Sequence, residues 1–371
     1  MAHQSIPSSS ATSPGVVGFR ALPDLACANV GGKVLQCTDD FFAEKENLIK
    51  PEAPVFIVGK FTDNGKWMDG WESRRKRVAG HDWAILALGT PGTVSGVVVD
   101  TSFFVGNFPE SCSLEAAALA DGEADPAALE KAVWTPLIPQ STLAGGTANY
   151  LPSEDTKTRV THIRFHIYPD GGVARLRVHG TPLPNWKALS ASAQGGLIDV
   201  ASALHGASVV TSNDAFFGAH SNLILPGRAA TMGDGWETRR KRILPGHDWI
   251  VVKLGRAARI QRVEVDTNHF KGNFPDSALV EAVYLDPSSP DVQRMQPMDF
   301  HRPHPLLAPE RFVTLVEQTK LNASEQRYFE KDQLKNTDKL VTHIRMKIFP
   351  DGGISRLRMW GAIELTDAEK Q

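Results

Sequence analysis

The sequence lacks the features that mark several classes of protein. It contains three cysteines in 371 residues and has a formal net charge of −2 at pH 7. So few cysteines argue against a disulfide-built scaffold, and so small a charge gives no support for nucleic acid or an anionic membrane as the main partner. No apolar run is long enough for a membrane span, and no basic-then-apolar signal peptide is visible. We therefore expect a cytoplasmic protein, with a peroxisomal location as the alternative.

The sequence does contain one long pattern twice, which indicates domain duplication rather than an array of short repeats. Apolar spacing alone would not require the Trp, His, Arg and Asp residues that both copies share. The shared motifs stand at these positions in the first and second copy: Asp-Gly-Trp-Glu-(Ser/Thr)-Arg-Arg-Lys-Arg at 69–77 and 234–242, Gly-His-Asp-Trp at 80–83 and 246–249, Asp-Thr and then Gly-Asn-Phe-Pro within 100–109 and 266–275, Thr-His-Ile-Arg and then Pro-Asp-Gly-Gly within 161–172 and 342–353. The duplication therefore indicates shared function as well as shared fold.

The repeat and the composition around it predict the domain boundaries. We expect a disordered leader at residues 1–20, the first repeat at 21–182, a linker rich in Pro, Ala, Ser and Gly at 183–195, the second repeat at 196–364 and a tail at 365–371. Each repeat is long enough for a domain with its own core.

The cysteines are not shared between the copies. Their counterparts are not cysteine: Cys27 aligns with Ser202, Cys37 with Ser212 and Cys112 with Ala278. A structural disulfide or a thiolate metal site would be expected in both copies, so we expect free thiols and no cysteine nucleophile.

Short apolar or alternating runs bounded by Gly, Pro or Asp predict strands, for example at 84–88 and 94–99. The alternation over His162–Tyr168, followed by Pro-Asp-Gly-Gly, predicts a hairpin. Helices are expected at Ser113–Leu119 and Pro309–Lys320. Many short strands in each copy favour a mainly β protein with two homologous jelly-roll β-sandwich domains.

The basic runs at 74–77 and 239–242 leave three interpretations open. Such runs are often solvated, and some bind nucleic acid or serve nuclear import. Because each run stands between acidic and aromatic residues, some of its arginines are expected to form ion pairs or to bind an anionic small molecule. Arg75 and Arg240 are our candidates for anion binding.

The His-Asp pairs, His81 with Asp82 and His247 with Asp248, are candidates for general acid–base chemistry because imidazole titrates near neutrality. The simpler alternative is a histidine that caps a turn ahead of a buried strand. A metal signal is weak, since no HxH, HxxxH or CxxC spacing lies nearby.

Asp100 and Asp266 end apolar runs and lead into the Gly-Asn-Phe-Pro loops, where they could face a cleft or simply cap the turn. The second copy has His269 and Lys271 in this loop, where the first copy has apolar residues. The first copy in turn has His166 where the second has Lys347. The sequence does not decide between the copies.

The expected strands at 162–168 and 343–349 each place a histidine and an arginine on one face. His162 and Arg164 share such a face, as do His343 and Arg345. That face is either exposed to solvent or the wall of a ligand site, and the pattern leaves both open.

Taken together and in this order, the doubled motifs resemble the allantoicase family, hydrolases of ureide and purine catabolism. The resemblance extends from about Asp24 to Gly361. It implies two jelly-roll domains, hydrolysis of allantoate to ureidoglycolate and urea during allantoin degradation, and a homo-oligomer. It requires no cofactor, although a divalent metal could polarise a ureido carbonyl.

The implied substrate defines what a site must contain. Allantoate needs a guanidinium for its carboxylate, polar groups for its ureido groups, a base, and an acid for the departing urea. The catalytic candidates are Glu72, His81, Asp100, Glu237, His247, Asp266 and His269. The substrate-binding candidates are Arg75, Asn107, His162, Arg164, Arg240, Asn273, His343 and Arg345.

The main alternative is a non-enzymatic jelly-roll module that binds carbohydrate or another small ligand, because fold alone does not decide function. Such modules usually show an aromatic platform and few charged groups. The doubled charged motifs of this chain disfavour that interpretation.

Overall fold

The computed structural model describes residues 18–120, 123–155, 157–293 and 305–370. The chain forms two compact units. Unit 1 contains the described residues up to Thr181 except Asn29–Gly31, and unit 2 contains Asn29–Gly31 and the described residues from Pro182 onward. Most of the expected leader lies outside the described residues, and Gly18–Ala21 form a 3-10 turn. Among the described helices, none is both long and apolar enough to cross a membrane.

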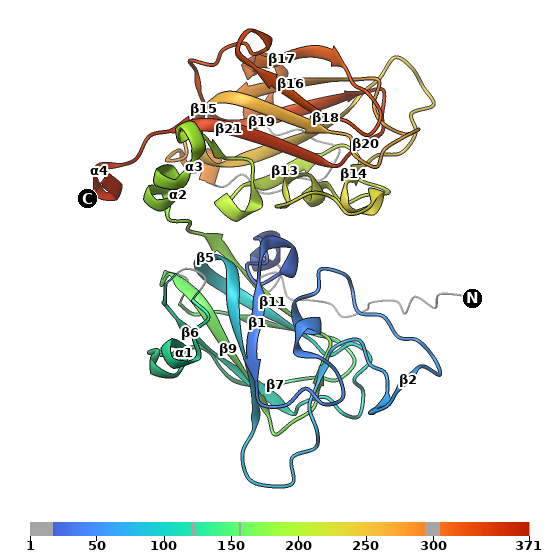
Figure 1. The fold of residues 1–371 in the computed structure, drawn as a ribbon, viewed down its shortest axis with the longest axis vertical. Coiled ribbons are helices and arrows are strands. Elements are labelled where there is room, and N and C mark those ends of the chain that lie inside the picture. The colour runs from blue at the N-terminus through green and yellow to red at the C-terminus, as the bar shows by residue number, and fades with distance from the viewer. Residues whose placement is uncertain (1–17, 121–122, 156, 294–304, 371) are drawn as a thin grey trace. The chain divides into compact units, whose positions relative to one another are not determined.

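Both units are mainly β, as predicted (Figure 1). The strands of unit 1 are β1 (Lys33–Cys37), β2 (Phe61–Thr62), β3 (Gly65–Lys66), β4 (Trp71–Glu72), β5 (Asp82–Asp100), β6 (Ser111–Ala117), β7 (Thr135–Thr142), β8 (Ala148–Pro152), β9 (Val160–Tyr168), β10 (Gly172–Val173) and β11 (Arg175–Pro182). Those of unit 2 are β12 (Ile198–Asp199), β13 (Ser208–Ser212), β14 (Trp236–Glu237), β15 (Asp248–Asp266), β16 (Ser277–Val283), β17 (Val313–Lys320), β18 (Gln326–Glu330), β19 (Leu340–Phe349), β20 (Gly353–Ile354) and β21 (Arg356–Ile363). The α-helices are α1 (Pro126–Lys131), α2 (Trp186–Ser192), α3 (Pro290–Gln293) and α4 (Asp367–Lys370).

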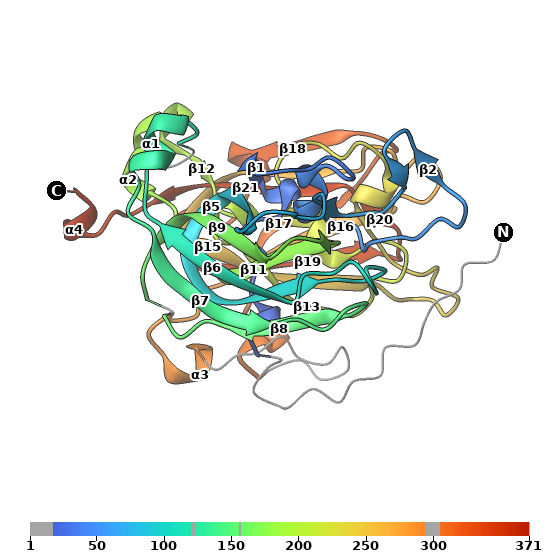
Figure 2. The same ribbon diagram turned by 90° about the horizontal axis from the view of Figure 1, so that it is seen from below.

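One long strand in each unit links two layers. The first part of β5, from Asp82 to Gly92, pairs with β9, while its last part, from Gly96 to Asp100, pairs with β8. One layer is therefore β1-β5-β9-β6-β7, and the other joins the end of β5 to β8 and β11. Figure 2 shows β9, β6 and β7 side by side. Unit 2 repeats this arrangement around β15.

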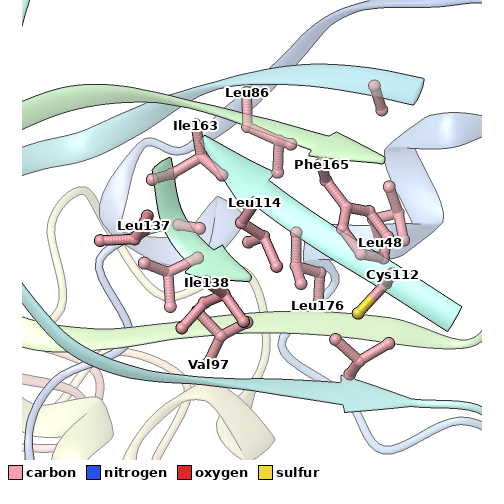
Figure 3. Close-up of a cluster of buried hydrophobic side chains, with 14 of the residues drawn as sticks. Leu48, Leu86, Val97, Cys112, Leu114, Leu137, Ile138, Ile163, Phe165 and Leu176 are labelled. Atoms are coloured by element: carbon pink, nitrogen blue, oxygen red, sulfur yellow. The ribbon is translucent and has the colours of Figure 1, made fainter. Parts of the chain in front are cut away.

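The core of unit 1 lies between these layers. Leu114, Ile163 and Phe165 come from the first layer, and Val97 and Leu176 come from the second (Figure 3). All five side chains are fully buried. The alternation along β9 directs Ile163 and Phe165 into this core, while Arg164 between them is partly exposed on the opposite face.

Both helix predictions are wrong. Residues 113–119 fall largely in β6, where Cys112, Leu114 and Ala116 alternate with less buried neighbours at a period of two. In the range 309–320, residues 309–311 form a 3-10 turn and the rest is mostly β17. Cross-strand pairing of both segments with long neighbouring strands outweighs their local helical propensity. The expected linker does contain a helix, α2.

The predicted hairpin at the Pro-Asp-Gly-Gly turn is also wrong. β9 pairs with β5 and β6, whereas β11 pairs with β5, and just ahead of β11 the Ala174 N–H donates to the carbonyl of Asp100 at the end of β5. Between them, β10 pairs with β4, Gly172 opposite Glu72. The turn therefore carries the chain from one layer to the other.

The cysteines are free thiols, as predicted. Cys112 is buried in the core of unit 1. Burial raises the pKa of the Cys112 thiol to about 12, so it remains protonated at neutral pH. It therefore serves as a small apolar core residue.

We predict that Phe165→Ala lowers the free energy of unfolding by about 3–5 kcal/mol, because it removes a fully buried aromatic side chain from the core. The matched variant Phe61→Ala, at a side chain that is 69% exposed, should change it by less than about 0.5 kcal/mol. Urea unfolding of the three proteins measures both values. Equal losses in the two variants would contradict this assignment of the core.

Candidate functional site

The repeated motifs of each unit meet around the Pro-Asp-Gly-Gly turn. In unit 1 the backbone N–H of Lys76 donates to Asp170 Oδ2 at 2.7 Å, and that of Asp82 donates to the Pro169 carbonyl at 3.1 Å. In unit 2 the N–H of Lys241 donates to Asp351 at 2.7 Å in the same way. Residues far apart in the sequence thus converge on one turn in both units.

Glycine is required within this turn. Gly171 has a φ of 136°, and a Cβ there would lie 2.7 Å from the Asn107 carbonyl oxygen. Gly352 repeats both features, with a φ of 137° and the Asn273 oxygen at 2.7 Å. This close approach joins the Gly-Asn-Phe-Pro loop to the turn, because any larger residue would clash.

An ion pair between a partly exposed lysine and a buried carboxylate anchors the basic run in each unit. Asp82 is fully buried, and Lys76 Nζ lies 2.5 Å from its Oδ1. Lys241 and the buried Asp248 form the equivalent pair. The lysine of each run is therefore structural, because a buried carboxylate without its cation is costly.

The arginines of the runs separate into two kinds. Arg74 pairs with Asp39 at 2.6 Å, and Arg239 pairs with Asp214 at 2.8 Å. Arg75 and Arg240 are exposed, and no partner is found for either within the described parts of the chain. These two guanidinium groups are thus free to bind an anion.

Glu72 and Asn107, both predicted site residues, contact each other. Asn107 Nδ2 donates to Glu72 Oε1 at 2.6 Å. Burial raises the pKa of Glu72, although this hydrogen bond and Lys66 oppose the shift. Asn273 donates to Glu237 in unit 2 at the equivalent position.

The remaining catalytic candidates, Asp100, Asp266 and His269, each have hydrogen-bond partners within their own unit. Asp100 accepts from the Ser102 N–H at 2.8 Å, and Asp266 accepts from the Asn268 N–H at 2.7 Å. Asp266 is buried and also accepts from Arg228 at 3.0 Å. His269 contacts the Ala229 carbonyl at 2.9 Å.

His162 and His343, both predicted to bind substrate, are buried. His162 contacts the Thr161 hydroxyl at 2.8 Å and the Glu123 carbonyl at 2.7 Å. His343 contacts the Thr342 hydroxyl at 3.0 Å. Burial and the charge of Lys253 lower the pKa of His343 to about 4. Both histidines therefore belong to the interior.

His81 belongs to a network on the outer face of β9. Its Nε2 lies 2.8 Å from Nδ1 of His166, and His166 Nε2 lies 2.9 Å from Glu115 Oε2. Arg164 Nε donates to the same oxygen at 2.7 Å. The His81 ring also packs on Tyr168 at 4.5 Å. This network brings together the predicted His81 and Arg164.

The pKa shifts of Glu115 and His166 indicate which groups of this network are charged. Burial alone would raise the pKa of Glu115, but the hydrogen bonds from His166 and Arg164 outweigh it and lower the pKa. Burial lowers the pKa of His166, against the opposing effect of Glu115. At neutral pH the network therefore holds a carboxylate, a guanidinium and a neutral His166.

The equivalent face of unit 2 has different chemistry. Lys347 takes the place of His166, and both Lys347 and Arg345 pair with Glu281, at 3.0 and 2.8 Å. His247 packs on Phe349 at 5.2 Å. Burial first, and the nearby lysines next, lower the pKa of His247. Unit 2 thus has an ion triplet where unit 1 has a histidine pair.

A shallow hollow of about 450 Å³ adjoins this face in unit 2. It is lined by residues 244–246, by Phe349 and by Ser277, whose hydroxyl accepts from Gln318 at 2.9 Å. In unit 1 the corresponding pair, Gln140 and Ser111, keeps the same 2.9 Å hydrogen bond. The hollow therefore lies beside Phe349, which takes the position of Tyr168 in the second copy of the repeat.

Sequence reasoning did not include Glu115, Tyr168 or His166 among the site candidates. The alternation along β9 did place His166 on the face of Arg164. Glu115 was overlooked as a site residue because its segment was predicted to be a helix. In the structure it belongs to β6 and lies opposite Arg164 on β9. No cluster of three or more His, Cys, Asp or Glu side chains suited to a metal occurs in the described part of the chain.

Comparison with known proteins points to one family. The allantoicase repeat profile matches residues 23–183 and again 198–364. "Probable allantoicase 1" of Burkholderia mallei is 44% identical over 345 residues, 93% of this chain and 96% of that protein. "Probable allantoicase" of Stutzerimonas stutzeri is 44% identical over 347 residues, 94% and 98% of the two chains. The crystal structure of Saccharomyces cerevisiae allantoicase matches with a TM-score of 0.74 at 31% identity, covering 94% of this chain and 98% of that one.

We predict that His343 makes folding pH-dependent. Its folded pKa of about 4 lies below the unfolded value, so only the unfolded state takes up the proton between about pH 6.5 and 4. The contribution of His343 to the free energy of unfolding is fully present above about pH 6.5. It decreases on acidification, by roughly 2 kcal/mol at pH 5. Urea unfolding at pH 7.5 and 5.0 should show a smaller loss in His343→Gln than in the parent. Identical losses would refute a neutral, buried His343.

Proposed function

The chain belongs to the allantoicase family, and from this we propose that it hydrolyses allantoate to ureidoglycolate and urea. The observation that supports the proposal most directly is that both repeats match the family, over nearly the full length of its relatives. The alternative of a non-enzymatic binding module is not favoured by these matches. The bond cleaved is then a non-peptide C–N bond of a linear ureide.

Allantoate has a carboxylate and two ureido groups on one carbon. Release of urea breaks the bond between that carbon and one ureido nitrogen, and this nitrogen must gain a proton as it leaves. A base must take a proton from water or from the N–H of the remaining ureido group. One imidazole can do both in turn, because it accepts a proton and returns it near neutral pH.

The face that contains His81 in unit 1 and the equivalent face around His247 in unit 2 are the two candidate places for this chemistry, of which one is sufficient. Each histidine is partly exposed, stands on an aromatic ring and follows the loop of the basic run. Arg75 or Arg240, on that loop, supplies a guanidinium for the substrate carboxylate. Glu72 and Asn107 hold the neighbouring loop through their mutual hydrogen bond.

The first test is the release of urea and ureidoglycolate from allantoate by the purified chain, with and without a chelator. Equal amounts of both products are expected. Release that survives chelation supports the carboxylate and histidine chemistry. Loss on chelation, restored by a divalent ion, would make the histidines metal ligands. No release from folded protein would refute the proposed activity.

We predict that the double variant Arg75→Ala/Arg240→Ala raises KM for allantoate about 10- to 100-fold while kcat changes little. The reason is that a charge-assisted hydrogen bond to the carboxylate contributes in both the ground and transition states. Initial-rate kinetics of the double variant and of each single variant measure this. Arg74→Ala/Arg239→Ala, at the ion-paired arginines, is the control and should leave KM within about threefold. An unchanged KM in the first double variant would remove these arginines from the substrate site.

A further inference from the structure

We propose that Glu115 and His166 are positioning residues that hold His81 in one tautomer and orientation, and that only unit 1 therefore performs the acid–base step. The inference rests on the proposed function. It assigns the chemistry to one copy of the repeat, a choice that the repeated motifs leave open.

The hydrogen bonds of unit 1 fix where each proton lies. Glu115 is a carboxylate and only accepts, so His166 must donate to it from Nε2. A neutral His166 then has its lone pair on Nδ1, which lies 2.8 Å from His81 Nε2. His81 must donate from Nε2, so its own lone pair is on Nδ1, where it can take a proton from the substrate or water.

The groups that surround His166 are consistent with hydrogen bonds donated from His81 to His166 and from His166 to Glu115. Glu115 approaches from β6, while Arg164 and Tyr168 lie on the strand of His166 itself, β9. Trp83 lies opposite on β5, and Ser113 lies opposite on β6 with its hydroxyl 2.9 Å from that of Tyr168. Glu115 is the one anion among these groups. When His81 is protonated, that charge stabilises the imidazolium through the neutral His166.

Unit 2 provides the contrast within the same chain. Lys347 stands where His166 stands, and its ammonium, paired with Glu281, has no lone pair to accept a proton from His247. Phe349 and Leu279 replace Tyr168 and Ser113, so the hydroxyl pair is absent too. The ring of His247 is therefore not fixed by an imidazole acceptor, although the scaffold beneath it is the same.

The first experiment compares His81→Gln with His247→Gln in the full chain. We expect kcat on allantoate to fall about 100-fold or more for His81→Gln and less than about threefold for His247→Gln. Equal effects of the two substitutions, or a larger effect of His247→Gln, would overturn the assignment to unit 1.

The second experiment tests the positioning role with Glu115→Gln. We expect kcat to fall about 10- to 100-fold, because the orienting carboxylate is lost while the imidazoles remain. The acidic limb of the pH profile of kcat/KM should move to lower pH, because the protonated form of the site loses a neighbouring anion. Glu115→Asp keeps the charge and should restore the position of that limb. A purely structural role would lower activity without moving the limb, and this result would overturn the proposal.

The third measurement does not depend on activity. Ring ¹⁵N chemical shifts of histidine-labelled protein should place the His81 proton on Nε2 in the parent chain and show a mixture of tautomers in Glu115→Gln. His166→Lys, which installs the residue of unit 2, should also give a mixture. A proton on Nδ1 of His81 in the parent would overturn the inference even if urea is released. Absence of urea release with the expected tautomer would instead refute the proposed function alone.

Discussion

In each unit, a buried carboxylate fixes the position of the basic run, on which the candidate site depends. Asp82 and Asp248 are wholly enclosed, and a charge in that environment requires a cation close by. Lys76 and Lys241 supply it from the middle of the basic run. Because this lysine pairs with the first residue of the long strand, the basic run is held next to the start of β5 in unit 1 and of β15 in unit 2.

The two units share this scaffold but differ on the face above it. A duplicated domain can keep its core and turns while its outer residues change, because outer side chains contribute little to packing. In unit 1 the outer face of β9 holds an imidazole pair backed by a carboxylate. In unit 2 the same carboxylate position neutralises a lysine and an arginine. Such a division lets one copy perform chemistry while the other contributes binding or stability.

Many of the strands could be predicted because their sequences are short apolar runs or alternate between apolar and polar residues. The strands at 84–88 and 94–99 were correct as segments, but they are parts of one strand, β5, whose two ends pair in different layers. The hairpin and both helices were wrong for a related reason. Each of those segments takes its structure from a partner strand distant in sequence, and local propensity does not contain that information.

The sequence by itself determined the duplication, the β class and the family, because repeated polar motifs and alternation are local features of the chain. It also placed His81, Arg75 and Arg164 among the candidates. Only the tertiary structure decided that His162 and His343 are interior, and that Glu115 stands beside His166. The physical reason is that burial and hydrogen bonding across strands depend on register between β6 and β9, which side-chain order along either strand alone cannot specify.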